Sequence, residues 1–114
     1  MHTPIEFQKF NDSNTIVEMS LKHDRALNIV FESNQGIVLL NNDLEIEKHA
    51  PGFYAFATDG GNEVYAFGQG GAVFMLPMIG LSEKDAIKVA NSWIEFEKII
   101  KLSAQQSDAS ETMT

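Results

Sequence analysis

Residues 53–78, FYAFATDGGNEVYAFGQGGAVFMLPM, contain the clearest structural pattern of this chain. Three runs rich in aromatic and aliphatic residues, 53–57, 63–67 and 72–78, are joined by two short segments that contain several glycines. Aromatic and β-branched residues favour strands, and short Gly-rich connections favour hairpins between neighbouring strands. The pattern therefore predicts three consecutive antiparallel strands.

The connection between the first two strands has the composition of a tight turn. It begins with Asp59, whose carboxylate can accept hydrogen bonds from the backbone that follows, and it continues with Gly60, Gly61 and Asn62. The third strand is apolar on both faces, so both faces must be covered, and we expect helices to cover them.

The clearest helix pattern lies near the C-terminus. Ser92 and Glu95 have the spacing of a capping box, in which each side chain hydrogen-bonds backbone at the start of a helix. One face of this helix is apolar and is predicted to be core: Trp93, Phe96, Ile99 and Ile100.

The segments before residue 50 have weaker patterns. The sequence leaves open whether residues 1–20 are helix or strand: residues 5–10 have an ambiguous pattern, and residues 15–23 have weakly helical spacing. Residues 24–33 are predicted to form a helix, ended by Asn34-Gln35-Gly36, because their apolar residues build one helical stripe. The apolar run 37–40 then predicts a short strand.

Two further segments complete the expected fold. Residues 44–49 are either one helical turn or a loop, and residues 82–90 begin with a helix N-terminus signature and predict a short helix. The fold class expected is α+β: a mainly antiparallel twisted sheet of four or five strands, packed with N- and C-terminal helices.

Length and composition indicate one domain. The chain has 114 residues, of which 44% are hydrophobic, and it has no cysteine, which excludes disulfides, thiol nucleophiles and cysteine-bound metals. We place the domain at residues 1–102. Residues 103–114 are polar and unpatterned, and we predict a disordered tail there.

The chain carries no sign of a membrane or secretory destination. No stretch approaches the roughly 18–20 consecutive apolar residues of a membrane span, and the N-terminus lacks the basic and apolar segments of a secretory signal. We therefore expect a cytoplasmic protein without membrane contact.

The formal net charge is −8, with sixteen acidic and eight basic side chains. Only one of the basic residues is an arginine, and they form no cluster, so we expect no direct binding of nucleic acid. An acidic surface instead suits a basic protein partner, because long-range attraction raises the encounter rate.

No residue set for catalysis stands out. The histidines, His2, His23 and His49, have no zinc-ligand spacing, and no serine lies in a nucleophile elbow. The Gly-rich segments lead into strands without a following lysine, unlike phosphate-binding loops. We expect no catalytic residue, no metal and no cofactor.

Five carboxylates lie in or beside predicted loops, where side chains can reach a partner. The candidate partner-binding residues are Asp43, Glu45, Glu47, Asp59 and Glu63. Two plainer roles compete with this one: Asp59 can serve its own turn, and all five can simply keep the protein soluble.

Residues 50–67, APGFYAFATDGGNEVYAF, combine an apolar strand, an acidic Gly-Gly turn followed by a Glu, and an aromatic strand. This pattern resembles the hallmark of the SUKH superfamily, which includes a yeast cell-wall-synthesis regulator and many bacterial immunity proteins. Residues 75–78 and 85–96 look like the family's closing strand and final helix, with Trp93 where a Phe is usual.

Other parts of the chain depart from the family pattern. Residues 21–36 look like its Leu-Pro-x-Asp/Glu helix ending in Asn-Gly-Gly, but Lys22 and Gln35 replace the usual Pro and Gly. Asn62 replaces a third glycine in the turn, and the segment between Gly36 and Pro51 is shorter than usual. The shortness suggests that an early strand or hairpin is missing.

The resemblance implies a non-catalytic protein that binds and neutralises a toxin domain, often a nuclease. A basic nuclease would match the net charge of −8, which ranks this function first. The alternative is a regulatory or scaffold module that binds a cellular protein, as in the fungal members. A small-molecule-binding domain is a third class, without support in the sequence.

Overall fold

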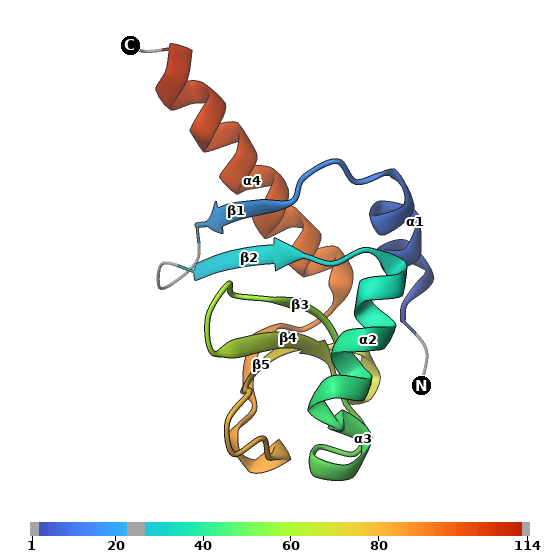
Figure 1. The fold of residues 1–114 in the computed structure, drawn as a ribbon. Helices are drawn as coiled ribbons and strands as arrows, with labels where there is room; N and C mark the ends of the chain where they lie inside the picture. Colours follow the sequence, from blue (N-terminus) through green and yellow to red (C-terminus); the bar gives the residue numbers. More distant parts are fainter. Residues whose placement is uncertain (1–2, 23–26, 113–114) are drawn as a thin grey trace.

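The computed structural model describes residues 3–22 and 27–112, with only the backbone for 105–112. Over these residues six strands form one antiparallel sheet whose strand order follows the chain, β1-β2-β3-β4-β5-β6 (Figure 1). The strands are β1 (Glu18–Leu21), β2 (Leu27–Phe31), β3 (Tyr54–Thr58), β4 (Glu63–Phe67), β5 (Val73–Pro77) and β6 (Ile87–Ala90). The helices are α1 (Ile5–Ser13), α2 (Asn34–Leu44), α3 (Ile46–His49) and α4 (Trp93–Thr112), with short 3-10 turns η1 (Gln69–Gly71) and η2 (Glu83–Asp85).

The three predicted central strands are confirmed as β3, β4 and β5, each antiparallel to the next. The turn between β3 and β4 is held as expected by Asp59, whose Oδ1 accepts hydrogen bonds from the backbone N–H groups of Gly61 (2.8 Å) and Glu63 (3.1 Å). The Glu63 carbonyl accepts in turn from the Asp59 N–H at 3.1 Å, which closes the hairpin.

Both faces of the sheet are buried, as the apolar character of β5 required. In β4 the buried residues alternate: Tyr65 and Phe67 pack into one cluster, Val64 and Ala66 into the other. Residues of α1 and α4 cover the first face, and α3 with the half-buried side of α2 covers the second (Figure 1).

The predicted core of the C-terminal helix is confirmed. Trp93, Phe96 and Ile100 are buried, and the half-buried Ile99 packs against them. Trp93 also meets Phe7 of α1 edge to face, with ring centroids 5.0 Å apart, so the two terminal helices share one aromatic cluster.

The N-terminal half differs from the sequence expectation. Residues 5–10 belong to α1, but the predicted helix over 24–33 is wrong from Leu27 onward, where the chain forms β2. Leu27, Ile29 and Phe31 are buried in strict alternation with less buried neighbours, which is the period of a strand and not of a helix. Residues 23–26 lie outside the described residues.

The choice between helix and strand that the sequence leaves open before residue 20 has both answers: Ile5–Ser13 is helical, whereas Glu18–Leu21, despite the weakly helical spacing of 15–23, is β1 and pairs with β2 from Glu18↔Val30 to Leu21↔Leu27. These added strands, together with β6, raise the count above the expected four or five. The antiparallel pair β1–β2 precedes Gly36. The segment between Gly36 and Pro51, whose shortness suggested a missing strand or hairpin, contains α2 and α3 and no strand.

Asn34-Gln35-Gly36 begins a helix instead of ending one. The Ser33 hydroxyl accepts a hydrogen bond from the Gly36 N–H at 3.0 Å and caps α2. The predicted strand 37–40 is consequently helical. Ile37, Leu40, Asn41 and Leu44 follow helical spacing and form the side of α2 that is turned to the protein.

Residues 82–90 do not form the predicted helix either. Ser82 caps only the single turn η2, and the chain then enters β6, where Ile87 pairs with Met75 and Lys88 with Phe74 of β5. The β-branched Ile87 and Val89 favour this strand. The alternative of a helical turn at 44–49 is the correct one, because Ile46–His49 forms α3.

The boundary predicted at residue 102 falls inside α4, which continues to Thr112. Ser103 is buried and joins the helix to the sheet: its Oγ accepts a hydrogen bond from the Lys22 N–H at 2.6 Å and donates to the Ile99 carbonyl at 2.8 Å. The first residue assigned to a tail is therefore part of the packed domain, and residues 113–114 lie outside the described residues.

Strand β2 pairs with only part of β3, and side chains supply hydrogen bonds beyond the two ends of this pairing. Only Val30↔Thr58 and Phe31↔Ala57 pair between these strands among the described residues. At one end the Tyr65 hydroxyl donates to the Asn28 carbonyl at 2.6 Å. At the other end Asn41 of α2 hydrogen-bonds the backbone of Ala55, so α2 covers the edge of β3 that β2 leaves open.

Candidate protein-binding surface

Three of the five candidate carboxylates lie together on the segment formed by α2 and α3. Asp43, Glu45 and Glu47 are all exposed. Glu45 forms a surface ion pair with Lys48 (3.7 Å), in which both side chains are more than half exposed (60% and 73%). Such exposed pairs contribute little to stability, so these carboxylates remain available to a partner.

The link between the two helices fixes where these side chains lie. Glu45 has φ 50° and ψ 48°, a left-handed conformation that ends α2, and its N–H donates to the Asn42 carbonyl at 3.1 Å. Its own carbonyl accepts hydrogen bonds from Lys48 and His49 and so starts α3. The tight reversal buries Ile46 and leaves Glu45 and Glu47 exposed on either side of it.

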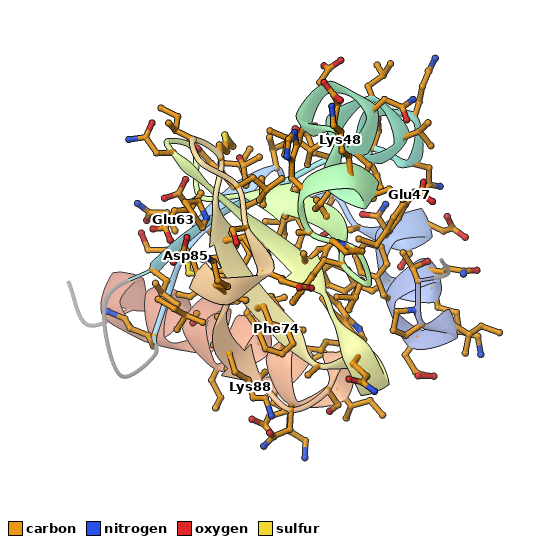
Figure 2. The ribbon with its side chains drawn as sticks, turned by 90° about the horizontal axis from the view of Figure 1, so that it is seen from below. Glu47, Lys48, Glu63, Phe74, Asp85 and Lys88 are labelled. Atoms are coloured by element: carbon orange, nitrogen blue, oxygen red, sulfur yellow. The ribbon has the colours of Figure 1, made fainter. Side chains whose placement is uncertain are left out.

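The other two candidates are placed elsewhere. Asp59 and Glu63 are half-buried at the turn between β3 and β4, and the Asp59 carboxylate is occupied by that turn. Figure 2 shows Glu63 and Glu47 on opposite sides of the molecule, with Glu63 on the same side as Asp85. The structure therefore does not bring the five carboxylates into one site.

The sequence interpretation missed two apolar residues of this surface. Val38 and Leu39 are 51% and 56% exposed, and each lies one helical turn before a polar residue of the same face, Asn42 and Asp43. In the sequence interpretation both residues belong to the predicted strand 37–40. The buried stripe from Ile37 to Leu44 would have revealed them, because a helix that buries this stripe turns Val38 and Leu39 to solvent.

Two open hollows lie on the molecule beside α2. One of about 430 Å³ lies against α1 and the start of α2 and includes Asp12 and Ile37 in its wall. The other, of about 710 Å³, lies against α3 and includes Asn41, Glu45 and Glu47. Tyr54, the first residue of β3, lines both.

The described residues offer no metal-binding group: nowhere do three or more His, Asp or Glu side chains gather closely enough to hold an ion. His49 lies in α3, whereas His2 and His23 are outside the described residues. In the described ranges no helix combines the length and the apolar character that crossing a bilayer requires.

Comparison of the chain with protein-family models and with curated proteins gives no match.

Proposed function

We propose that this protein is a non-catalytic binding domain of the immunity type, which neutralises a basic toxin domain such as a nuclease. The observation that carries the proposal is the surface of α2 and α3. There the exposed Val38 and Leu39 lie one helical turn before Asn42 and the carboxylate Asp43, and the exposed carboxylates Glu45 and Glu47 follow where the chain turns into α3.

This combination suits a protein partner. Interfaces bury an apolar centre inside a polar rim, and rim charges mainly set the rate of encounter. A chain of net charge −8 attracts a basic protein and repels the phosphates of nucleic acid, so the proposed partner is a protein.

The resemblance of residues 50–67 and 85–96 to the SUKH superfamily supports immunity as the role of this binding. The family's bacterial members commonly neutralise toxins, and a nuclease toxin is typically basic. An immunity protein needs only to cover the functional surface of the toxin and needs no catalytic residues of its own. The sequence interpretation accordingly expects none.

The test uses the C-terminal toxin domain of a large secreted protein encoded beside this chain, purified and immobilised. Association and dissociation rates are measured across a salt series. We expect the association rate to fall steeply with salt while the dissociation rate changes little, because only long-range attraction is screened.

Two double variants that change the net charge equally test where the toxin domain contacts this protein. Glu45→Lys/Glu47→Lys and Glu83→Lys/Asp85→Lys each replace two carboxylates by two ammonium groups and raise the formal net charge from −8 to −4. The first pair alters the α2–α3 surface, and the second alters exposed residues of η2.

We expect the first pair to slow association more than the second. Binding that is independent of salt and equal in both variants would remove the electrostatic part of the proposal. Failure to bind any such toxin domain, combined with copurification of a housekeeping protein at the same surface, would favour a regulatory module over an immunity protein.

A further inference from the structure

The two hollows beside α2 share Tyr54 as a lining residue and follow one another along the same side of the helix. Together we call them the Tyr54 groove. It follows one side of α2, whose residues Asn34, Ile37, Asn41 and Glu45 line it at helical spacing. In Figure 1, α1 lies at the upper end of α2 and α3 at its lower end, so these helices bound the groove at its two ends.

The groove exists because of how β2 and β3 part. Pairing between them ends at Phe31↔Ala57, and Asn41 then occupies the backbone of Ala55. Tyr54 lies one residue further along β3, where neither β2 nor the Asn41 amide covers it, and its side chain remains half-buried. Tyr54 therefore packs against the core and also lines both open hollows.

The charged residues of the groove are unbalanced. Its wall contains three carboxylates, Asp12 near α1 and Glu45 and Glu47 near α3, against one ammonium group, Lys48. The formal sum is −2, and Lys48 is already paired with Glu45. An acidic segment would be repelled from both ends, and a basic one attracted to both.

We propose that the Tyr54 groove binds an arginine-containing segment of the partner. One guanidinium group stacks on the Tyr54 ring, and basic residues before and after that arginine in the segment face Asp12 and Glu47. Arginine fits better than lysine because its planar, weakly hydrated group stacks on aromatic rings and pairs with carboxylates in a fixed geometry. This inference rests on the proposed function, since the segment belongs to the basic partner.

The experiment selects binders from a phage-displayed library of random linear 12-residue peptides on the immobilised full chain. The strongest peptides are synthesised, and their affinity is measured by calorimetry against the protein and its variants. We expect the selected peptides to be rich in arginine and to carry few carboxylates.

Variants in the groove then test its parts. Tyr54→Phe keeps the ring and should bind as the unaltered chain does, whereas Tyr54→Leu should weaken binding about tenfold. Asp12→Asn and Glu47→Gln keep shape and lose charge, and each should weaken binding about threefold. Glu83→Lys/Asp85→Lys, distant from the groove, should change affinity less than Glu47→Gln does.

Selected peptides without arginine would overturn the proposal, and so would arginine peptides that bind Tyr54→Leu, Asp12→Asn and Glu47→Gln as tightly as the unaltered chain. If Tyr54→Leu does not fold, the two surface variants decide. If arginine peptides bind in the groove but the protein binds no toxin domain, the proposed immunity function is wrong and the proposal for the groove stands. If the toxin domain binds all groove variants as tightly as the unaltered chain, the proposal for the groove is wrong and the proposed immunity function stands.

Discussion

The side-chain amide of Asn41 takes the place of a neighbouring strand for Ala55. Its Oδ1 accepts a hydrogen bond from the Ala55 N–H and its Nδ2 donates to the Ala55 carbonyl, both at 2.8 Å. The same Nδ2 donates to the Ile37 carbonyl inside α2, also at 2.8 Å. One buried amide thus satisfies both backbone groups at a position of β3 that β2 does not pair.

Replacing Asn41 by Ala should lower the free energy of unfolding by about 2–4 kcal/mol, because the buried N–H and carbonyl of Ala55 both lose their partner. Urea denaturation measures the change. Asn42→Ala, one residue away and exposed, is the matched control and should stay within about 0.5 kcal/mol. Equal midpoints for the two variants would show that solvent replaces the amide at no cost.

Gly68 is packed too closely for any side chain. A Cβ there would lie 2.6 Å from Cε1 of Phe74 and 2.9 Å from Cε1 of Phe53, two rings that meet edge to face. Gly68→Ala should therefore cost about 1–3 kcal/mol through displacement of these rings.

Gly61→Ala is the control for this overpacking. Its Cβ would come no closer than 3.5 Å to Asp59, and its backbone is not in the left-handed region. The two alanine variants are compared by thermal denaturation. An equally high melting temperature for both would mean that Phe53 and Phe74 can move apart freely.

Truncation of the aromatic core should be severe. Trp93→Ala and Phe96→Ala are each expected to cost about 3–5 kcal/mol, whereas Ile94→Ala, on the exposed side of α4 (52% exposed), should cost less than about 1 kcal/mol. The indole Nε1 of Trp93 is buried without a hydrogen-bond partner among the described residues. Trp93→Phe consequently loses volume but no hydrogen bond, and about 1–2 kcal/mol is expected. Chemical denaturation of the four variants measures these changes in the free energy of unfolding. An equal loss in Trp93→Phe and Trp93→Ala would contradict the expectation.

The end of the packed domain is set by Ser103. A chain shortened to residues 1–104 should keep its stability to within about 1 kcal/mol, because the removed residues are polar. Ser103→Ala in the full chain should itself cost about 1 kcal/mol, since the Lys22 N–H loses its acceptor. Calorimetric melting of both proteins checks this, and a larger loss in the shortened chain would place essential contacts beyond residue 104.

The sequence predicted the segments in which several signals agree. Strands β3, β4 and β5 combine aromatic residues with Gly-rich turns, and the start of α4 combines a capping box with an apolar face. Glu95 N–H does donate to Ser92 Oγ (3.1 Å), although the Glu95 carboxylate accepts from Asn91 instead of Ser92. Where the patterns for helix and strand conflict, the prediction is wrong. The apolar residues of Leu27–Phe31 fit a two-residue period as well as an approximate helical one, and pairing with β1 favours the strand.

The candidate site was predicted only in part for a related reason. Asp43, Glu45 and Glu47 are exposed as expected, but the Asp59 carboxylate serves its own turn. Tyr54 was read as part of a strand, which is correct. That it lines a groove follows from the early departure of β2, and this depends on a register that a single sequence does not specify.

The strand order has a consequence for how the chain emerges during synthesis. Each strand pairs with the strand before or after it in the chain, so every hairpin can close as soon as its own residues have left the ribosome. The hydrogen bond between Lys22 and Ser103, in contrast, spans 81 residues. Until α4 is synthesised, only α1 can cover the aromatic face of the nascent sheet, and in that interval the chain is most exposed to aggregation and to chaperones.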